Sequence, residues 1–122
     1  MKKFLLTLSL FIFSFSSMAY TLEEIAGTYV ITNAHFPTQT IIEIDSEGNV
    51  SLTDQSLYGD LQCYGYATVE RGLLKSEVLC ENDLEFVQKV DLTEVENINE
   101  FTANVYSSLF GVTIAMDFKK IK

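Results

Sequence analysis

The residue types that most often carry out catalysis are scarce in this chain. His35 is the only histidine among 122 residues, so neither a histidine-rich metal site nor a serine–histidine pair supported by a second histidine can form. The two cysteines, Cys63 and Cys80, do not form a Cys-x-x-Cys redox motif. We therefore expect a protein that is not an enzyme, with no catalytic residue, no cofactor and no metal.

Two groups of acidic residues are the remaining candidates for chemistry. One contains Glu81, Asp83 and Glu85, and the other lies between residues 91 and 100. Neither has the Asp-x-Asp-x-Asp-Gly pattern of a calcium-binding EF-hand loop, and no pair of carboxylates can be assigned to a glycosidase cleft. The ordinary interpretation is that these are solvated turn residues, and a weak cation site is the alternative.

The charge balance limits the possible partners. The chain has 17 acidic and 8 basic residues, a formal net charge of −9, while 48% of its residues are hydrophobic. This composition is typical of a folded domain, and its acidity argues against binding to nucleic acid or to anionic lipid. A protein partner attracted by long-range electrostatics would have to be basic.

The first 19 residues resemble a secretory signal peptide. Lys2 and Lys3 precede an apolar run, which is shorter than the about 20 residues of a membrane span and is followed by the small-x-small site Ser17-Met18-Ala19. Cleavage would remove two of the 8 basic residues and none of the 17 acidic ones, which changes the net charge from −9 to −11. We expect a periplasmic or extracellular protein with one domain over residues 20–122, no membrane span and a monomeric state.

The mature chain has the pattern of an all-β protein. A capping box at Thr21–Glu24 predicts one short helical turn, which Gly27 ends. Afterwards, runs rich in β-branched and aromatic residues alternate with short polar connections, which leave no room for crossover helices. The pattern predicts an eight-stranded antiparallel up-and-down barrel, with a sandwich as the alternative. The expected strands cover residues 28–36 (ended by Pro37), 40–45, 50–53, 61–70, 73–81, 84–92, 101–107 and 112–118, and a polar loop covers 54–60.

One hairpin can be predicted in register. If Arg71-Gly72 forms a two-residue turn, the numbers of paired residues are fixed, and Cys63 lies opposite Cys80 in a non-hydrogen-bonded pair. Such pairs bring side chains closest together, so we expect a cross-strand disulfide. A bulge in either strand would shift this register by one residue. In the predicted register Tyr64 and Tyr66 face outward.

The order of elements resembles that of the lipocalins and the wider calycin group. Ile25-Ala26-Gly27-Thr28-Tyr29 follows the helical turn and opens the first strand, where these families have a Gly-x-Trp motif that closes the barrel base. Tyr29 stands in the place of the Trp, and Phe118-Lys119-Lys120 stands where an Arg usually stacks on it. The resemblance implies a closed barrel whose lumen binds a small apolar ligand. By size, acidity, signal peptide and disulfide, the chain also looks like small periplasmic barrels that inhibit lysozyme or proteases.

Two kinds of binding site follow from these observations. We expect a non-catalytic secreted binding protein that holds a small apolar ligand in its lumen. The inward-facing candidates for the lumen are Phe86, Phe101, Val105, Met116 and Phe118. The alternative is an inhibitor or binder of a basic enzyme such as lysozyme, acting through surface loops and an outer tyrosine face. Its candidate residues are Leu57, Tyr58, Tyr64 and Tyr66. A structural role in the cell envelope is a third class.

Overall fold

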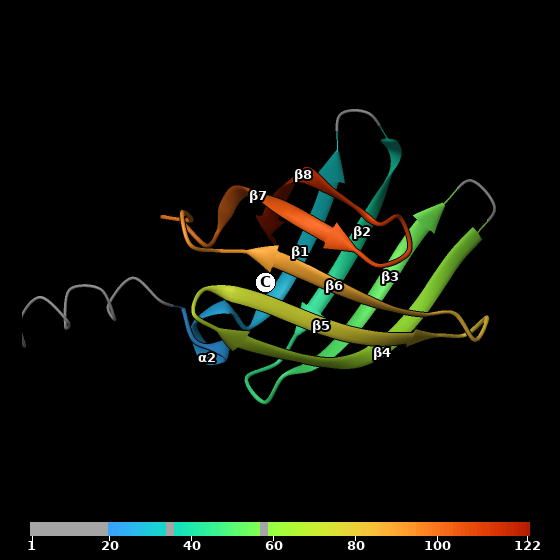
Figure 1. Cartoon of the computed structure of the whole chain (residues 1–122), viewed down its shortest axis with the longest axis horizontal. Coiled ribbons are helices and arrows are strands. Elements are labelled where there is room, and N and C mark those ends of the chain that lie inside the picture. Colours follow the sequence, from blue (N-terminus) through green and yellow to red (C-terminus); the bar gives the residue numbers. More distant parts are fainter. Residues whose placement is uncertain (1–19, 34–35, 57–58) are drawn as a thin grey trace, which may run out of the picture.

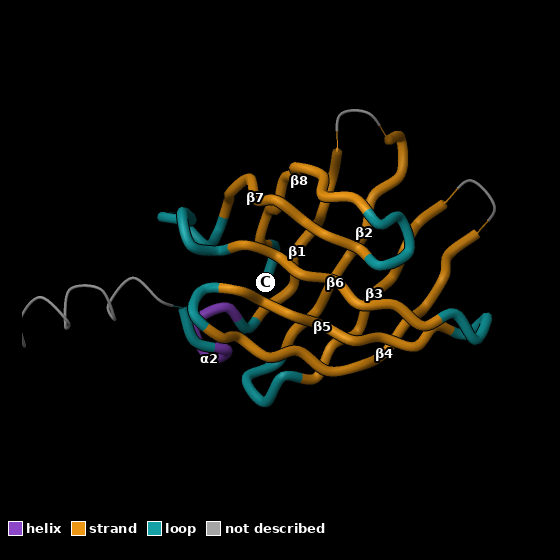
Figure 2. The backbone as a smooth tube through the Cα atoms, in the orientation of Figure 1, coloured by secondary structure: helices purple, strands orange, loops and turns teal. Residues whose placement is uncertain are grey.

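The computed structural model describes residues 20–33, 36–56 and 59–122, with only the backbone of 36–38 and 56 (Figure 1). In this part of the chain eight antiparallel strands form one closed barrel in sequence order, because β8 pairs with β1 (Figures 1 and 2). The expected up-and-down barrel is therefore confirmed and the sandwich is excluded. The strands are β1 Gly27–Asn33, β2 Phe36–Ile44, β3 Asn49–Ser56, β4 Gly59–Glu70, β5 Leu73–Cys80, β6 Glu85–Asp91, β7 Glu100–Ser107 and β8 Val112–Lys120.

The predicted helical turn is present as α2, Leu22–Ile25. Its capping box has both expected hydrogen bonds: Glu24 N donates to Thr21 Oγ1 (3.2 Å), and Thr21 N donates to the Glu24 carboxylate (3.2 Å). These bonds satisfy backbone N–H groups that a four-residue helix cannot satisfy itself. The Tyr29 hydroxyl donates to the Ile25 carbonyl, which ties α2 to the first strand.

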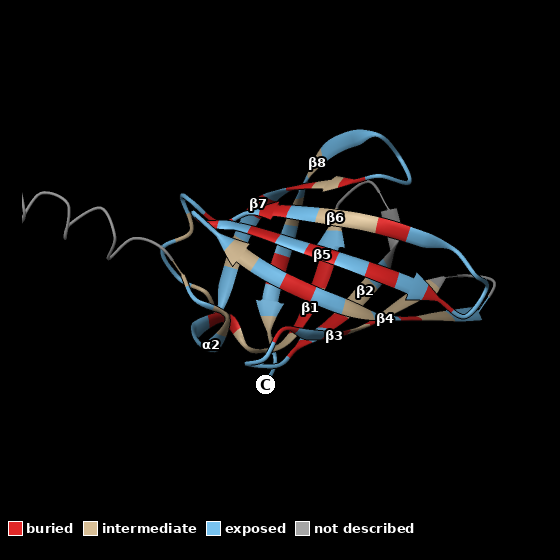
Figure 3. Ribbon diagram, turned by 60° about the horizontal axis from the view of Figure 1, so that its bottom comes forward, coloured by how far each residue is buried: buried red, intermediate tan, exposed pale blue. Residues whose placement is uncertain are grey.

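Alternation of side chains places one face of every strand inside the barrel. Figure 3 shows the regular alternation of buried and exposed residues along β5. The buried residues of all eight strands, together with Ile25 and Leu92, form a single hydrophobic core. Because an antiparallel strand repeats every two residues, the apolar positions seen in the sequence are those that face this core.

The predicted hairpin register is confirmed. Glu70 pairs with Leu73 and Cys63 pairs with Cys80, and the two cysteines form a disulfide. Arg71 and Gly72 both have positive φ angles, 53° and 79°, as a primed two-residue turn requires. No bulge shifts this hairpin, so Tyr64 and Tyr66 do face outward.

The strand end predicted at Pro37 is wrong. Pro37 does not end the first strand, since β1 ends at Asn33 and Pro37 is the second residue of β2. It lies close to a register shift between Ile31 and Asn33, where the ladder is already irregular and a missing N–H costs little.

The predicted polar loop 54–60 is also wrong at both ends. β3 continues to Ser56 and β4 begins at Gly59, with Asp54 paired to Leu61 and Gln55 paired to Asp60. Polar side chains bond across the outer face here: Gln39 Nε2 donates to Gln55 Oε1 (2.7 Å). Leu57 and Tyr58 themselves, like His35 and the predicted signal peptide, lie outside the described residues. None of the helices in the described part is long and apolar enough to cross a bilayer.

Candidate functional site: the barrel lumen

One end of the barrel is closed. The helix α2 lies there, together with the turns that follow β2, β4 and β6 (Figure 1). Ile25 and Leu92 are each only 1% exposed, and backbone bonds tie the turns to their neighbours, from Ala67 N to Gly48 O (2.7 Å) and from Leu92 N to Gly72 O (2.8 Å). We call this end the base.

The base is also stabilised by aromatic side chains. The rings of Tyr29 and Phe101 meet edge to face with centroids 6.3 Å apart, and Phe101 stacks on Phe118 at 4.7 Å. The Lys120 ammonium lies 5.7 Å from the centroid of the Tyr29 ring. Burial, together with the nearby Tyr20, raises the pKa of Tyr29 to about 12, so its phenol stays protonated and keeps its bond to Ile25 into alkaline solution.

The interior of the barrel above the base is hollow. It contains a cavity of about 200 Å³. Most of the residues that line it are aliphatic or aromatic, and inward-facing residues on neighbouring strands form rows across the wall. Leu74, Val90 and Val105 make one such row on β5, β6 and β7. The cavity can therefore hold an apolar molecule against a wall that is mostly apolar.

All five lumen candidates from the sequence line this cavity: Phe86, Phe101, Val105, Met116 and Phe118. Phe86, Val105 and Phe118 are buried, whereas Phe101 and Met116 are half-buried. On β8 the inward-facing Ile114 is half-buried as well, although it lies in a closed barrel. These partly exposed inner side chains border the empty space rather than fill it. Their role in ligand binding stays a prediction.

At the end opposite the base, part of the described lining of the cavity is exposed to solvent, and these residues were not predicted from the sequence. Four apolar side chains line the cavity and are also exposed to solvent: Leu84 (37%), Leu109 (42%), Phe110 (69%) and Val112 (52%). They come from the turns after β5 and β7 and from the start of β8. We call this group the mouth. A signal was available, because Leu109-Phe110 is a bulky apolar pair in a turn that should favour polar residues.

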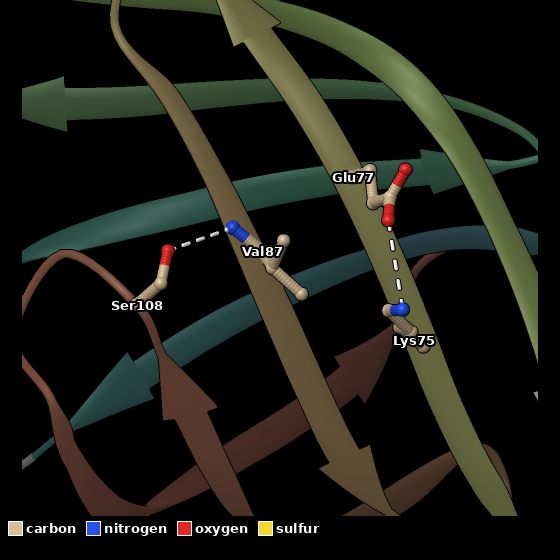
Figure 4. A network of polar contacts seen from close by, with 4 residues as sticks. All are labelled: Lys75, Glu77, Val87 and Ser108. Carbon is tan, nitrogen blue, oxygen red and sulfur yellow. Dashed lines mark hydrogen bonds and ion pairs between the residues drawn. The ribbon is translucent and has the colours of Figure 1, made fainter.

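The wall beside the mouth has a short seam between β6 and β7. Only Gln88, Lys89 and Val90 pair there with β7 residues. At the next position the Ser108 side chain replaces a backbone carbonyl as the acceptor. Val87 N donates to Ser108 Oγ (3.0 Å) (Figure 4), and Ser108 N donates to Val87 O (2.9 Å). On the adjacent strand β5, Lys75 and Glu77 form an exposed ion pair at 3.5 Å. Such an exposed pair contributes little to stability.

Five polar residues also line the lumen: Thr40, Asp54, Ser76, Gln88 and Ser107. The Thr40 hydroxyl donates to Asp54 Oδ1 at 3.5 Å, and Ser107 Oγ accepts a bond from Leu109 N at 3.3 Å. In the described part of the chain, the side chains of Ser76 and Gln88 form no hydrogen bond with the protein, and no polar side-chain atom without a partner is fully buried. Both groups are therefore open to the cavity. Asp54 is the one charged residue among the described residues of the wall.

The predicted surface residues do not form one site. Tyr64 and Tyr66 are 58% and 72% exposed on the outer face of β4, and Tyr64 pairs with the exposed Leu79 of β5. The structure therefore gives Tyr64, Tyr66 and Leu79 a common surface, which we call the tyrosine face. Leu57 and Tyr58 lie outside the described residues. Tyr106, a further outward tyrosine, is half-buried and has the Lys89 ammonium 5.8 Å from its ring centroid.

The acidic groups do not assemble into a centre. Glu81, Asp83 and Glu85 are exposed around the turn after β5. Within residues 20–33, 36–56 and 59–122 no three histidine, cysteine or acidic side chains are placed to hold a metal ion. The pKa of Asp91 is lowered by hydrogen bonds from Thr93, an ordinary turn contact.

Comparison of the chain with family models, with curated protein sequences and with solved structures gives no significant match.

Proposed function

We propose that this protein is a non-catalytic binding protein that holds a small apolar ligand in its lumen. The observation that supports the proposal is a mostly apolar cavity that continues to the mouth, where Leu109, Phe110 and Val112 are exposed. Exposed apolar side chains around a cavity are unfavourable in water, and a ligand that covers them gains that free energy. The modest volume favours a slender molecule, such as a single alkyl or polyene chain.

The disulfide fits the proposed location. Cystine bridges persist in oxidising compartments, and Cys63–Cys80 joins two strands of the lumen wall. Together with the predicted signal peptide, it supports a periplasmic or extracellular protein. A ligand carrier there would meet apolar molecules outside the cytoplasm.

Binding of the fluorescent polyene diphenylhexatriene tests the proposal. Ile114 lines the cavity, so Ile114→Trp places a large ring inside the lumen. Thr113→Trp places the same ring on the outer face of the same strand, and in each variant it is the one tryptophan of the chain. We expect the wild type and Thr113→Trp to bind the probe with equal affinity, within about twofold. Ile114→Trp should lower the affinity at least about tenfold because it fills the cavity.

The measurement is probe fluorescence against protein concentration, with thermal unfolding to show that both variants are folded. Absence of saturable binding to the wild type would refute the proposal. Equal binding to Ile114→Trp and Thr113→Trp would also refute it, because the probe would then lie outside the lumen.

The tyrosine face supports a second candidate function, the binding of a basic protein such as lysozyme. Tyr64 and Tyr66 are more than half exposed, and Leu79, opposite Tyr64, is 50% exposed. Tyrosine is common at protein interfaces because it buries a large area at low entropic cost. The predicted mature charge of −11 would attract a basic partner over long range.

This second function predicts a salt-dependent interaction. We expect lysozyme to bind in dilute buffer and to bind more weakly as salt is added. The double variant Tyr64→Ala/Tyr66→Ala should weaken binding at least about tenfold, whereas Thr68→Ala on the same outer face should not change it. Surface plasmon resonance measures this directly. If lysozyme does not bind in dilute buffer, or binds the double variant as tightly as the wild type, this candidate is eliminated.

A further inference from the structure

Three of the polar residues in the lumen form a continuous row. Ser76 of β5 pairs with Gln88 of β6, and Gln88 pairs with Ser107 of β7. All three face inward and line the cavity. In the sequence, Gln88 interrupts an otherwise apolar inward face, and the register makes it the centre of this row.

This row lies within an otherwise apolar wall. Towards the base, two residues further along each strand, the next inward row is Leu74, Val90 and Val105. Towards the mouth, Val78 pairs with Phe86. Two residues of a strand span about 7 Å, so apolar surface lies about 7 Å from the polar row on either side.

The free hydrogen-bonding capacity of the row lies in Ser76 and Gln88. Ser76 is 3% exposed, and in the described part of the chain neither its hydroxyl nor the Gln88 amide has a protein partner. Ser107 differs, because its oxygen already accepts a bond from Leu109 N. Polar groups that face an apolar cavity without partners are unfavourable unless water or a ligand bonds to them.

The charge of the wall restricts the ligand further. No lysine, arginine or histidine is among the described lining residues, and the one charged lining residue is the carboxylate-bearing Asp54. A carboxylate or phosphate ligand would enter without a counter-ion, and both Asp54 and the net charge of −9 would repel it.

We infer that the ligand is an uncharged amphiphile, with an apolar body and one neutral polar group that bonds to Ser76 and Gln88, and that Asp54 disfavours anionic analogues. The apolar body lies against the Leu74, Val90 and Val105 row. An alcohol or an amide has the required chemistry, because it can donate to and accept from a hydroxyl and a carboxamide. This inference rests on the proposed function, since it names the ligand class of the same lumen.

Displacement of diphenylhexatriene by three matched amphiphiles tests the inference. Decanol, decanoate and decyltrimethylammonium share one alkyl chain and differ in charge, and each is used below the concentration at which it forms micelles. At neutral pH we expect decanol to displace the probe at a concentration at least about tenfold lower than either ion requires. Decanoate is repelled by Asp54, and the quaternary nitrogen of decyltrimethylammonium can neither donate a hydrogen bond to Ser76 and Gln88 nor accept one from them, so its attraction to Asp54 leaves both groups without a partner.

Two pairs of variants assign the effect to residues. Gln88→Leu should raise the decanol concentration needed to displace the probe by about fivefold. It should not lower the affinity for the probe itself, because the probe forms no hydrogen bonds. The same amide-to-leucine change at the exposed Asn104 should alter neither quantity. Asp54→Asn should lower the decanoate concentration needed to displace the probe by at least about threefold. Asp60→Asn, which removes an exposed charge from the neighbouring strand, should leave that concentration unchanged.

Each outcome has a definite meaning. If the probe binds in the lumen but decanoate or decyltrimethylammonium displaces it as well as decanol does, the inference is overturned and the proposed function stands. If decanol is preferred but Gln88→Leu behaves like Asn104→Leu, the assignment of the polar group to this row is overturned. If the probe does not bind the lumen at all, both the inference and the proposed function fail.

Discussion

Replacement of both Cys63 and Cys80 by alanine is expected to lower the free energy of unfolding by about 3 kcal/mol. The bridge joins residues 17 apart in sequence, and it restricts the unfolded chain by closing that loop. Both cysteines are buried in the wall of the barrel, so their truncation also removes packing. The bridge lies on the mouth side of the β4–β5 hairpin, far from its turn, where pairing has the least local support.

Urea unfolding of the oxidised wild type and of the double variant measures this loss. Wild-type protein kept in a thiol reductant is the matched control, and it should lose most of the same stability without any substitution. Two titratable thiols in the unreduced, denatured wild type would contradict the account, as would equal unfolding midpoints in the presence and absence of reductant.

Gly65→Ala is expected to destabilise the barrel by about 3 kcal/mol. A Cβ atom at this position would lie 1.8 Å from the Glu77 carbonyl oxygen and 2.8 Å from Val78 Cα. Both are backbone atoms of β5, so no side chain can rotate away and the two strands must separate. Because Gly65 pairs with Val78 between the disulfide and the turn, the separation would disturb the β4–β5 hairpin along its middle.

Gly59→Ala is the control for Gly65→Ala. Its φ angle is +117°, which strains an alanine, but the added Cβ would meet nothing within 4 Å. We expect it to cost about 1 kcal/mol, from backbone strain alone. If the unfolding curves of the two variants coincide, the close approach of β4 and β5 at Gly65 is not a feature of the folded protein.

Much of the fold was predictable because local rules specify it. The turn at Arg71 and Gly72 has only two residues, so it fixes the register of the hairpin and with it the partner of Cys63. The inward positions of Phe86 and Val105 follow from alternation along strands with one polar face. In each case the information lies within one strand or one hairpin.

The missed features depend on contacts between distant segments. Around Asp54 the strand is polar on both faces, so alternation is invisible and the stretch resembles a loop. Leu84 and Phe110 become neighbours of one cavity only after the barrel has closed, because they lie in different turns. The row of Ser76, Gln88 and Ser107 likewise requires the registers of two hairpins at once. Sequence periodicity contains none of this information.

The most direct test of an apolar lumen that binds an uncharged amphiphile is a crystal structure of the protein grown with decanol. We predict electron density for one alkyl chain that lies against the row of Leu74, Val90 and Val105, with its hydroxyl within hydrogen-bonding distance of Gln88. A lumen filled by Phe101, Met116 and Phe118, with no density for decanol, would contradict the account and would direct attention to the tyrosine face.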